Sequence, residues 1–208
     1  MSDAKTLKTL LFAGLDLGPV QDPTALAVLE RTLLPDPTRP DKTRTHYAVR
    51  HLHRYPPGTP YPALVAEVVG LFADPPLRGT VLAVDQTGVG RPVIDLLRRA
   101  GLHARLQPIT LTAGSRESSG SSGERLVPKQ DLVSALQVLL QSRRLVVAPA
   151  LAEAQTLVQE LESFRLKVTV AADETLAWRE GRNDDLVLAV GVAAWEGELY
   201  REWKLRIF

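Results

Sequence analysis

Four aspartates in this sequence lie where an apolar run meets a loop. Asp16 comes late in LLFAGLDLG, Asp85 ends TVLAVD, and Asp184 and Asp185 precede LVLAVGVAAW. Carboxylates held close together raise each other's pKa, so they need a proton or a cation to compensate them. The chain has no cysteine and no suitable pair of histidines, and a site with only oxygen ligands favours Mg²⁺ or Mn²⁺ over zinc. These residue types therefore predict a carboxylate site for a hard divalent cation.

Each aspartate also has an ordinary structural interpretation. Asp184 could cap the N-terminus of the following helix, because aspartate is a common residue at that position. Asp16 could end a strand at a turn, and Asp85 could accept hydrogen bonds in the following QTGVG turn. Aspartates occur at three element ends in this sequence. One shared site explains this pattern better than three unrelated turns do.

The first half of the chain predicts the strands that must position Asp16 and Asp85. Three segments are rich in β-branched and aromatic residues and predict antiparallel strands: residues 9–18, 24–34 and 45–55. Helices are predicted over 61–73 and 90–101, a buried parallel strand over 79–87, and a further strand over 104–112. If the first and fourth strands are neighbours, the two aspartates lie side by side at the carboxyl ends of strands, where α/β sheets bind ligands.

The second half predicts mainly helices. Residues 113–125 are rich in serine and glycine and predict a mobile loop. Helices are expected over 128–144 and 150–165, with short strands at 145–149 and 166–172. The helix that begins at Asp185 is apolar nearly all round and must be buried, which holds its acidic end against the sheet. We expect one α/β domain over residues 1–208, a mixed sheet flanked by helices.

The composition of the chain does not decide whether its binding partner is a nucleic acid. The formal charge is +1, from 25 basic and 24 acidic residues, so only local patches can decide whether nucleic acid binds. The N-terminal apolar stretch reaches Asp16 too early for a signal peptide or a membrane span. We therefore expect a soluble, cytoplasmic protein with no membrane partner.

Five segments together match the pattern of a known family. They are GLDLGPVQDPTALAVLE (14–30), VDQTGVGRPVIDLLRRAG (84–101), VPKQDLVSALQVLL (127–140), ELESF (160–164) and NDDLVLAVGVAAW (183–195). The chain resembles the nuclease domain of viral large terminase subunits, from bacteriophages among others. The resemblance implies an RNase H-like fold, with three antiparallel strands followed by parallel ones.

The resemblance also implies which residues are catalytic. It assigns divalent-metal binding to Asp16, Asp85 and the pair Asp184 and Asp185. Some terminases and the related Holliday junction resolvases have a histidine three residues before the ligand aspartate. Counting back from Asp185 gives Arg182 instead, so both members of the pair stay candidates.

The implied activity is two-metal hydrolysis of double-stranded DNA during viral genome packaging, with low sequence specificity. Asp16 would bridge both ions, Asp85 would complete one site and Asp185 the other. Because Mg²⁺ is held by few protein ligands plus water and substrate phosphate, we expect two ions with DNA and one or none without it.

Basic residues are expected to hold the DNA backbone. The candidates are Lys129, Arg179 and Arg182, near the acids by sequence or motif, and Arg116 and Arg125 around the Ser/Gly loop. The other implied partners are an ATPase motor domain, a small terminase subunit and a portal. The sequence contains no GxxxxGK[ST] phosphate loop, so we expect a cut-out domain or a stand-alone relative that cuts DNA without pumping it.

Three alternatives stay open. A Holliday junction resolvase or another RNase H-like nuclease would differ in its preferred substrate structure. A sugar kinase or actin-like ATPase also uses aspartate–glycine turns, but that architecture needs two such domains and a longer chain. A non-catalytic packaging module would instead dock through the C-terminal segment YREWKLRIF.

Overall fold

The computed structural model describes residues 8–39, 41–88, 90–114, 116–121, 123–171 and 184–200. The strands are β1 (Lys8–Asp16), β2 (Thr24–Pro35), β3 (Thr43–Tyr55), β4 (Val81–Asp85), β5 (Arg105–Thr112), β6 (Ser118–Ser119), β7 (Arg125–Pro128) and β8 (Leu145–Val147). The helices are α1 (Tyr61–Leu71), α2 (Gly90–Arg99), α3 (Lys129–Gln141), α4 (Ala154–Ala171) and α5 (Asp185–Leu199). Among the described residues, no helix combines the length and apolar character needed to span a membrane.

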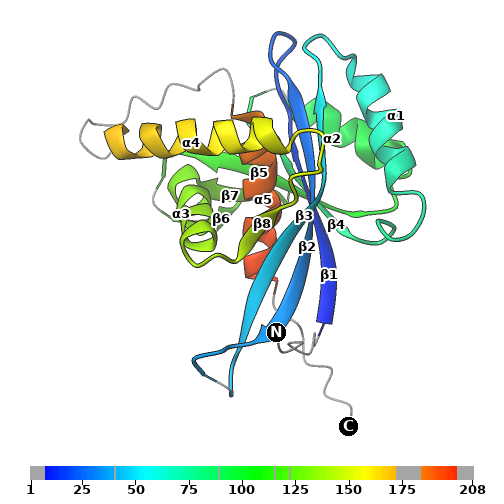
Figure 1. Cartoon of the computed structure of the whole chain (residues 1–208). Helices are drawn as coiled ribbons and strands as arrows, with labels where there is room; N and C mark the ends of the chain where they lie inside the picture. Colours follow the sequence, from blue (N-terminus) through cyan, green and yellow to red (C-terminus); the bar gives the residue numbers. More distant parts are fainter. Residues whose placement is uncertain are drawn as a thin grey trace.

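The strands form one mixed sheet in the order β6-β7-β5-β4-β1-β2-β3-β8 (Figure 1). The first three strands are an antiparallel meander, as the sequence predicts. β4 then pairs with β1 in parallel, and β5 and β7 continue outward in parallel from β4. The predicted α/β architecture and the adjacency of the first and fourth strands are therefore confirmed.

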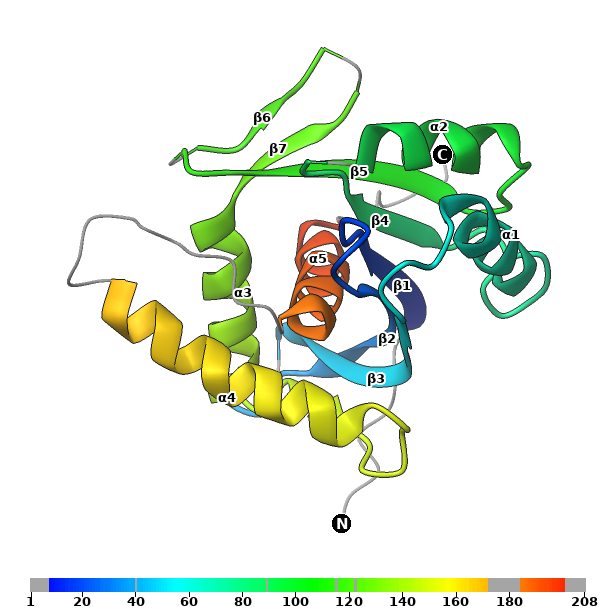
Figure 2. The ribbon, with the colours of Figure 1, turned by 90° about the horizontal axis from the view of Figure 1, so that it is seen from above.

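Helices cover both faces of the sheet. α1 and α2 lie on one face, where Leu64 and Ile94 pack against Leu15 and Val84. α5 lies on the other face against β1 and β2, with α3 and α4 packed outside it, so that it is enclosed on all sides (Figure 2). Every residue of α5 from its first to Gly197 is buried. This confirms the expectation that the last helix belongs to the core, because a helix apolar all round has no face suited to water.

Two glycines let α5 approach its neighbours closely. A Cβ added to Gly14 of β1 would lie 2.0 Å from the carbonyl oxygen of Ala189. A Cβ added to Gly191 would lie 2.8 Å from a side-chain carbon of Leu132 on α3. The α5 backbone thus rests directly on the strand that carries Asp16, and this contact brings the first turn of α5 to the carboxyl end of β1.

Residues 166–171, the described part of the predicted last strand over 166–172, do not form a strand. α4 continues as a helix to Ala171. The β-branched residues there favour a strand only where a neighbouring strand offers a pleated surface to pack on, and the sheet does not include this segment.

The Ser/Gly-rich segment contains a short piece of strand. Ser118 and Ser119 pair with Leu126 and Arg125 as the β6–β7 ladder at one edge of the sheet. The mobility expected for residues 113–125 remains a prediction.

Candidate active site

Asp16 and Asp85 are direct register partners on adjacent parallel strands. Their neighbours Leu15 and Val84 face the core under α1 and α2, so both aspartates face α5. Neighbouring strands lie about 4.8 Å apart, and the two side chains are only 9% and 5% exposed. The sheet therefore holds two buried carboxylates side by side.

Asp85 also fulfils its ordinary structural interpretation. Its Oδ1 accepts hydrogen bonds from the backbone N–H of Thr87, at 2.9 Å, and from the Thr87 hydroxyl. The Thr87 hydroxyl oxygen in turn accepts from the N–H of Leu111 on β5. Gly88 follows with φ at +77°, a backbone conformation that glycine adopts without strain. The turn thus fixes the orientation of the Asp85 carboxylate.

Asp184 and Asp185 lie at the N-terminus of α5, where they are 6% and 7% exposed. Asp184 occupies the N-cap position, but its side chain makes no capping hydrogen bond to the helix. Glu160 of α4 instead accepts hydrogen bonds from backbone N–H groups in the first turn of α5. Its Oε2 accepts from the N–H groups of Leu186 and Val187 at 3.0 and 3.2 Å. The aspartate pair is therefore positioned by a glutamate from a different helix.

Mutual repulsion links these carboxylates. The pKa of Asp16 is raised well above its ordinary value, first by burial and then by the negative charges of Asp85, Asp185 and Asp184. The charge of Lys129, at the start of α3, acts in the opposite direction. Four aspartates from three elements, together with one predicted DNA-binding lysine, therefore share one electrostatic environment.

Arg54 of β3 is a member of the site that the sequence analysis missed. Its Nε and Nη2 donate to Oδ2 of Asp185 at 3.1 and 2.7 Å, and Nη2 lies 3.9 Å from Oε1 of Glu160. Burial raises the pKa of Asp185 and the guanidinium of Arg54 opposes the shift, while the charge of Asp22 adds to it. Asp185 is thus paired with a cation inside the protein.

Glu160 and Asp22 were missed as well, and each had a signal in the sequence. Glu160 opens the ELESF segment, which carries part of the family resemblance. Asp22 lies in the turn between β1 and β2, so it returns toward the end of the strand that carries Asp16. Burial raises the pKa of Glu160 to about 7, against the hydrogen bond from Val187.

Of the other predicted DNA-binding residues, Arg125 makes its contacts away from the aspartates. Arg125 forms an ion pair with Glu196 at 3.2 Å and lies over the ring of Trp195, toward the C-terminal end of α5. Arg116 is exposed in the β5–β6 connection. Arg179 and Arg182 lie outside the described residues. Their roles stay predictions.

The donor set suits a hard divalent cation. A buried carboxylate whose pKa is raised by neighbouring aspartates, as that of Asp16 is, is stabilised by a positive ion, and Mg²⁺ and Mn²⁺ prefer oxygen ligands of this kind. Within the described ranges, no three His, Asp or Glu side chains converge as a preformed metal centre.

Comparison with solved structures finds the same fold in the large terminase nuclease from thermophilic phage G20c. The TM-score is 0.56 at 19% sequence identity, over 95% of this chain and 86% of the other. No family model and no curated protein matches the sequence. The chain therefore has the RNase H-like fold of a terminase nuclease, as the resemblance implied.

Proposed function

We propose that this chain is a divalent-metal-dependent endonuclease that cleaves double-stranded DNA during viral genome packaging. The observation that supports it best is the placement of Asp16 and Asp85 as register partners facing the buried acidic end of α5. The fold shared with the phage G20c nuclease supports the same assignment. The protein would act in the cytoplasm of the host cell, with a packaging motor, small subunit and portal as partners.

In this proposal Asp16, Asp85 and the pair Asp184 and Asp185 hold Mg²⁺ or Mn²⁺. The bound ions would supply an acidic water at neutral pH and positive charge opposite the scissile phosphate. The turn at Thr87 orients the Asp85 carboxylate, and the first turn of α5, held by Glu160, orients the aspartate pair. Lys129 places a positive charge beside the acids, where a DNA phosphate can use it.

A plasmid assay tests this function. We expect the wild-type chain with Mg²⁺ or Mn²⁺ to nick and then degrade supercoiled DNA, because backbone contacts carry little sequence information. Asp16→Asn and Asp85→Asn should each abolish cleavage, since each removes a negative ligand. Asp95→Asn is the matched control, because Asp95 of α2 is 51% exposed and pairs with Arg98 at 3.4 Å.

The outcome distinguishes the alternatives. Full activity in folded Asp16→Asn and Asp85→Asn variants would reject the proposed site. A strong preference for four-way junctions over linear duplex would indicate a resolvase rather than a packaging nuclease. Intact DNA with the wild-type chain and Mn²⁺ would favour the non-catalytic docking module.

A further inference from the structure

A second cavity lies at the opposite end of the molecule from the aspartates. It measures about 580 Å³ and is lined by the β2–β3 hairpin, the turn between α3 and β8, and the C-terminal part of α5. Ala25 pairs with Asp16, whereas Arg31 of this hairpin cavity pairs with Leu10. Arg31 therefore lies six residues along β2 from Ala25, the partner of Asp16. At roughly 3.3 Å per residue, this separation is about 20 Å. The hairpin forms the lower end of the sheet in Figure 1.

Arginines dominate the charge of the hairpin cavity. Its charged lining residues are Arg31, Arg39, Arg44, Arg144, Asp36 and Glu198. Arg39 pairs with Asp36 at 3.4 Å, and Arg144 pairs with Glu198 at 2.7 Å. In the part of the chain that the structure describes, Arg31 and Arg44 have no carboxylate partner. The cavity therefore carries an excess of two positive charges.

Arg31 is the residue that points to a ligand. It is 7% exposed, and its Nε has no hydrogen-bond partner among the residues that the structure describes. Its guanidinium carbon lies 6.0 Å from the centre of the Tyr200 ring, which offers an aromatic face but no negative charge. Burying a charge is costly unless it is paired and hydrogen-bonded. An anion in the cavity would supply both.

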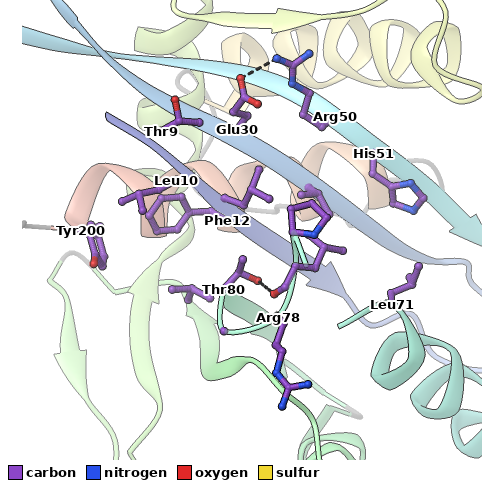
Figure 3. A pocket seen from close by; sticks show the side chains of 16 residues that line it. Thr9, Leu10, Phe12, Glu30, Arg50, His51, Leu71, Arg78, Thr80 and Tyr200 are labelled. Atoms are coloured by element: carbon purple, nitrogen blue, oxygen red, sulfur yellow. Dashed lines mark hydrogen bonds and ion pairs between the residues drawn. The ribbon is translucent and has the colours of Figure 1, made fainter. Parts of the chain in front are cut away.

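Another, larger cavity provides a contrast. It measures about 750 Å³ and contains two arginines, Arg50 and Arg78 (Figure 3). Arg50 pairs with Glu30 at 2.7 Å, and Arg78 donates to the carbonyl oxygen of Ala73 at 3.0 Å. Both of these arginines are satisfied within the protein. Among the described residues, the buried arginine nitrogen that has no hydrogen-bond partner, Nε of Arg31, belongs to the hairpin cavity.

The electrostatic field at the hairpin agrees with this assignment. The pKa of His46, on β3 beside the cavity, is lowered by burial and then by the charges of Arg44 and Arg144. A guanidinium presents a planar fork of N–H donors that matches the geometry of phosphate and carboxylate oxygens. We propose that the hairpin cavity is a phosphate-binding site, with Arg31 and Arg44 as its charged ligands.

Two kinds of ligand can bring a phosphate group to this site. One is a phosphodiester of DNA that the chain holds away from the aspartates, and the other is a free phosphate-bearing small molecule. The site stands apart from the proposed nuclease activity, because it shares no residue with the acidic cluster. Its test therefore works without added metal and without cleavage.

The test uses the full chain in EDTA. Thermal unfolding is measured with and without inorganic phosphate, and the affinity for a short DNA duplex is measured by fluorescence anisotropy over a range of salt. The variants are Arg31→Gln and Arg44→Gln. Arg50→Gln is the control, since it removes an equal charge from a neighbouring strand where the arginine already has a partner. Arg44 is exposed, so its variant decides the test if Arg31→Gln fails to fold.

We expect phosphate to raise the Tm of the wild type and the control but not that of Arg31→Gln or Arg44→Gln. If DNA is the source, both variants also lose about tenfold in duplex affinity, the effect of one lost charged hydrogen bond. The slope of log K against log salt then becomes shallower by about 0.9 for each lost contact. Protection by phosphate with unchanged DNA affinity would assign the site to a small molecule. Identical behaviour of Arg44→Gln and Arg50→Gln in both assays would overturn the proposal.

Discussion

Arg54→Gln removes the cation paired with Asp185, and we expect this variant to bind Mn²⁺ more tightly than the wild-type chain. Arg54 donates two hydrogen bonds to one carboxylate oxygen of Asp185, at 3.1 and 2.7 Å. A metal ion at Asp185 must share or displace this partner. Without Arg54, the aspartates keep their mutual repulsion and lose the internal charge that offsets it.

The magnitude follows from the burial of the pair. Unit charges about 4 Å apart interact by about 4 kcal/mol at an effective dielectric constant of about 20. The Arg54 side chain is 22% exposed and that of Asp185 10%, so water screens the pair in part, and glutamine retains a donor. If about half of this interaction energy is lost in the variant, Mn²⁺ binding gains roughly 2 kcal/mol, which corresponds to about a 30-fold lower Kd for Mn²⁺.

Isothermal titration of Mn²⁺ into the chain without DNA measures this directly. Arg50→Gln is the matched control, because Arg50 lies on the same strand and pairs with Glu30 rather than with the aspartates. We expect its Mn²⁺ affinity to equal that of the wild type. Adding Asp185→Asn to Arg54→Gln should cancel the gain, since the ligand whose charge is released is then absent.

Two results would refute the reasoning. A folded Arg54→Gln variant that binds Mn²⁺ no more tightly than the wild type would show that Arg54 does not compete with the metal. An equal gain in Mn²⁺ affinity in Arg50→Gln would show that the effect comes from the change in net charge and not from the loss of the Arg54–Asp185 pair.

The remaining predictions concern the scaffold of the site and one ion pair. Glu160→Ala should lower the free energy of unfolding by about 2–3 kcal/mol, because two buried N–H groups of α5 lose their acceptor; urea unfolding measures it, and Glu162→Ala, at an exposed position of α4, should change little. Gly14→Ala should cost about 1–3 kcal/mol or more, since the new methyl group would collide with the Ala189 carbonyl; Gly70→Ala, in a helix with open space around it, should be neutral or stabilising in the same assay. The third prediction concerns Glu198, where burial raises the pKa but hydrogen bonds from Thr45 and Arg144 outweigh it and lower the pKa overall. A depressed carboxyl pKa contributes its full stability above the unfolded pKa of about 4.3. The Tm advantage of the wild type over Glu198→Gln should therefore decline as the pH falls below that value and disappear once the pH passes below the lowered pKa of the folded protein; an advantage that persists at still lower pH would contradict it.

Local patterns in the sequence were enough to predict most of the fold. The meander and β4 were recognisable because residue alternation, apolar runs and turn residues act over a few neighbouring positions. The burial of α5 followed from its composition, since Leu186 and the residues after it leave no polar face. The prediction of a strand over residues 166–172 was wrong for its described part, 166–171, because the choice between helix and strand there depends on whether the sheet offers a neighbour.

The sequence by itself determined that Asp16, Asp85, Asp184 and Asp185 stand at the ends of apolar elements, because the same short-range patterns that define an element also mark its end. Only the tertiary structure decided what surrounds them. The bond from Arg54 to Asp185 joins residues 131 positions apart, and the bond from Leu186 to Glu160 spans 26. Contacts over such separations depend on how β3, α4 and α5 pack, and no pattern within one element contains that information.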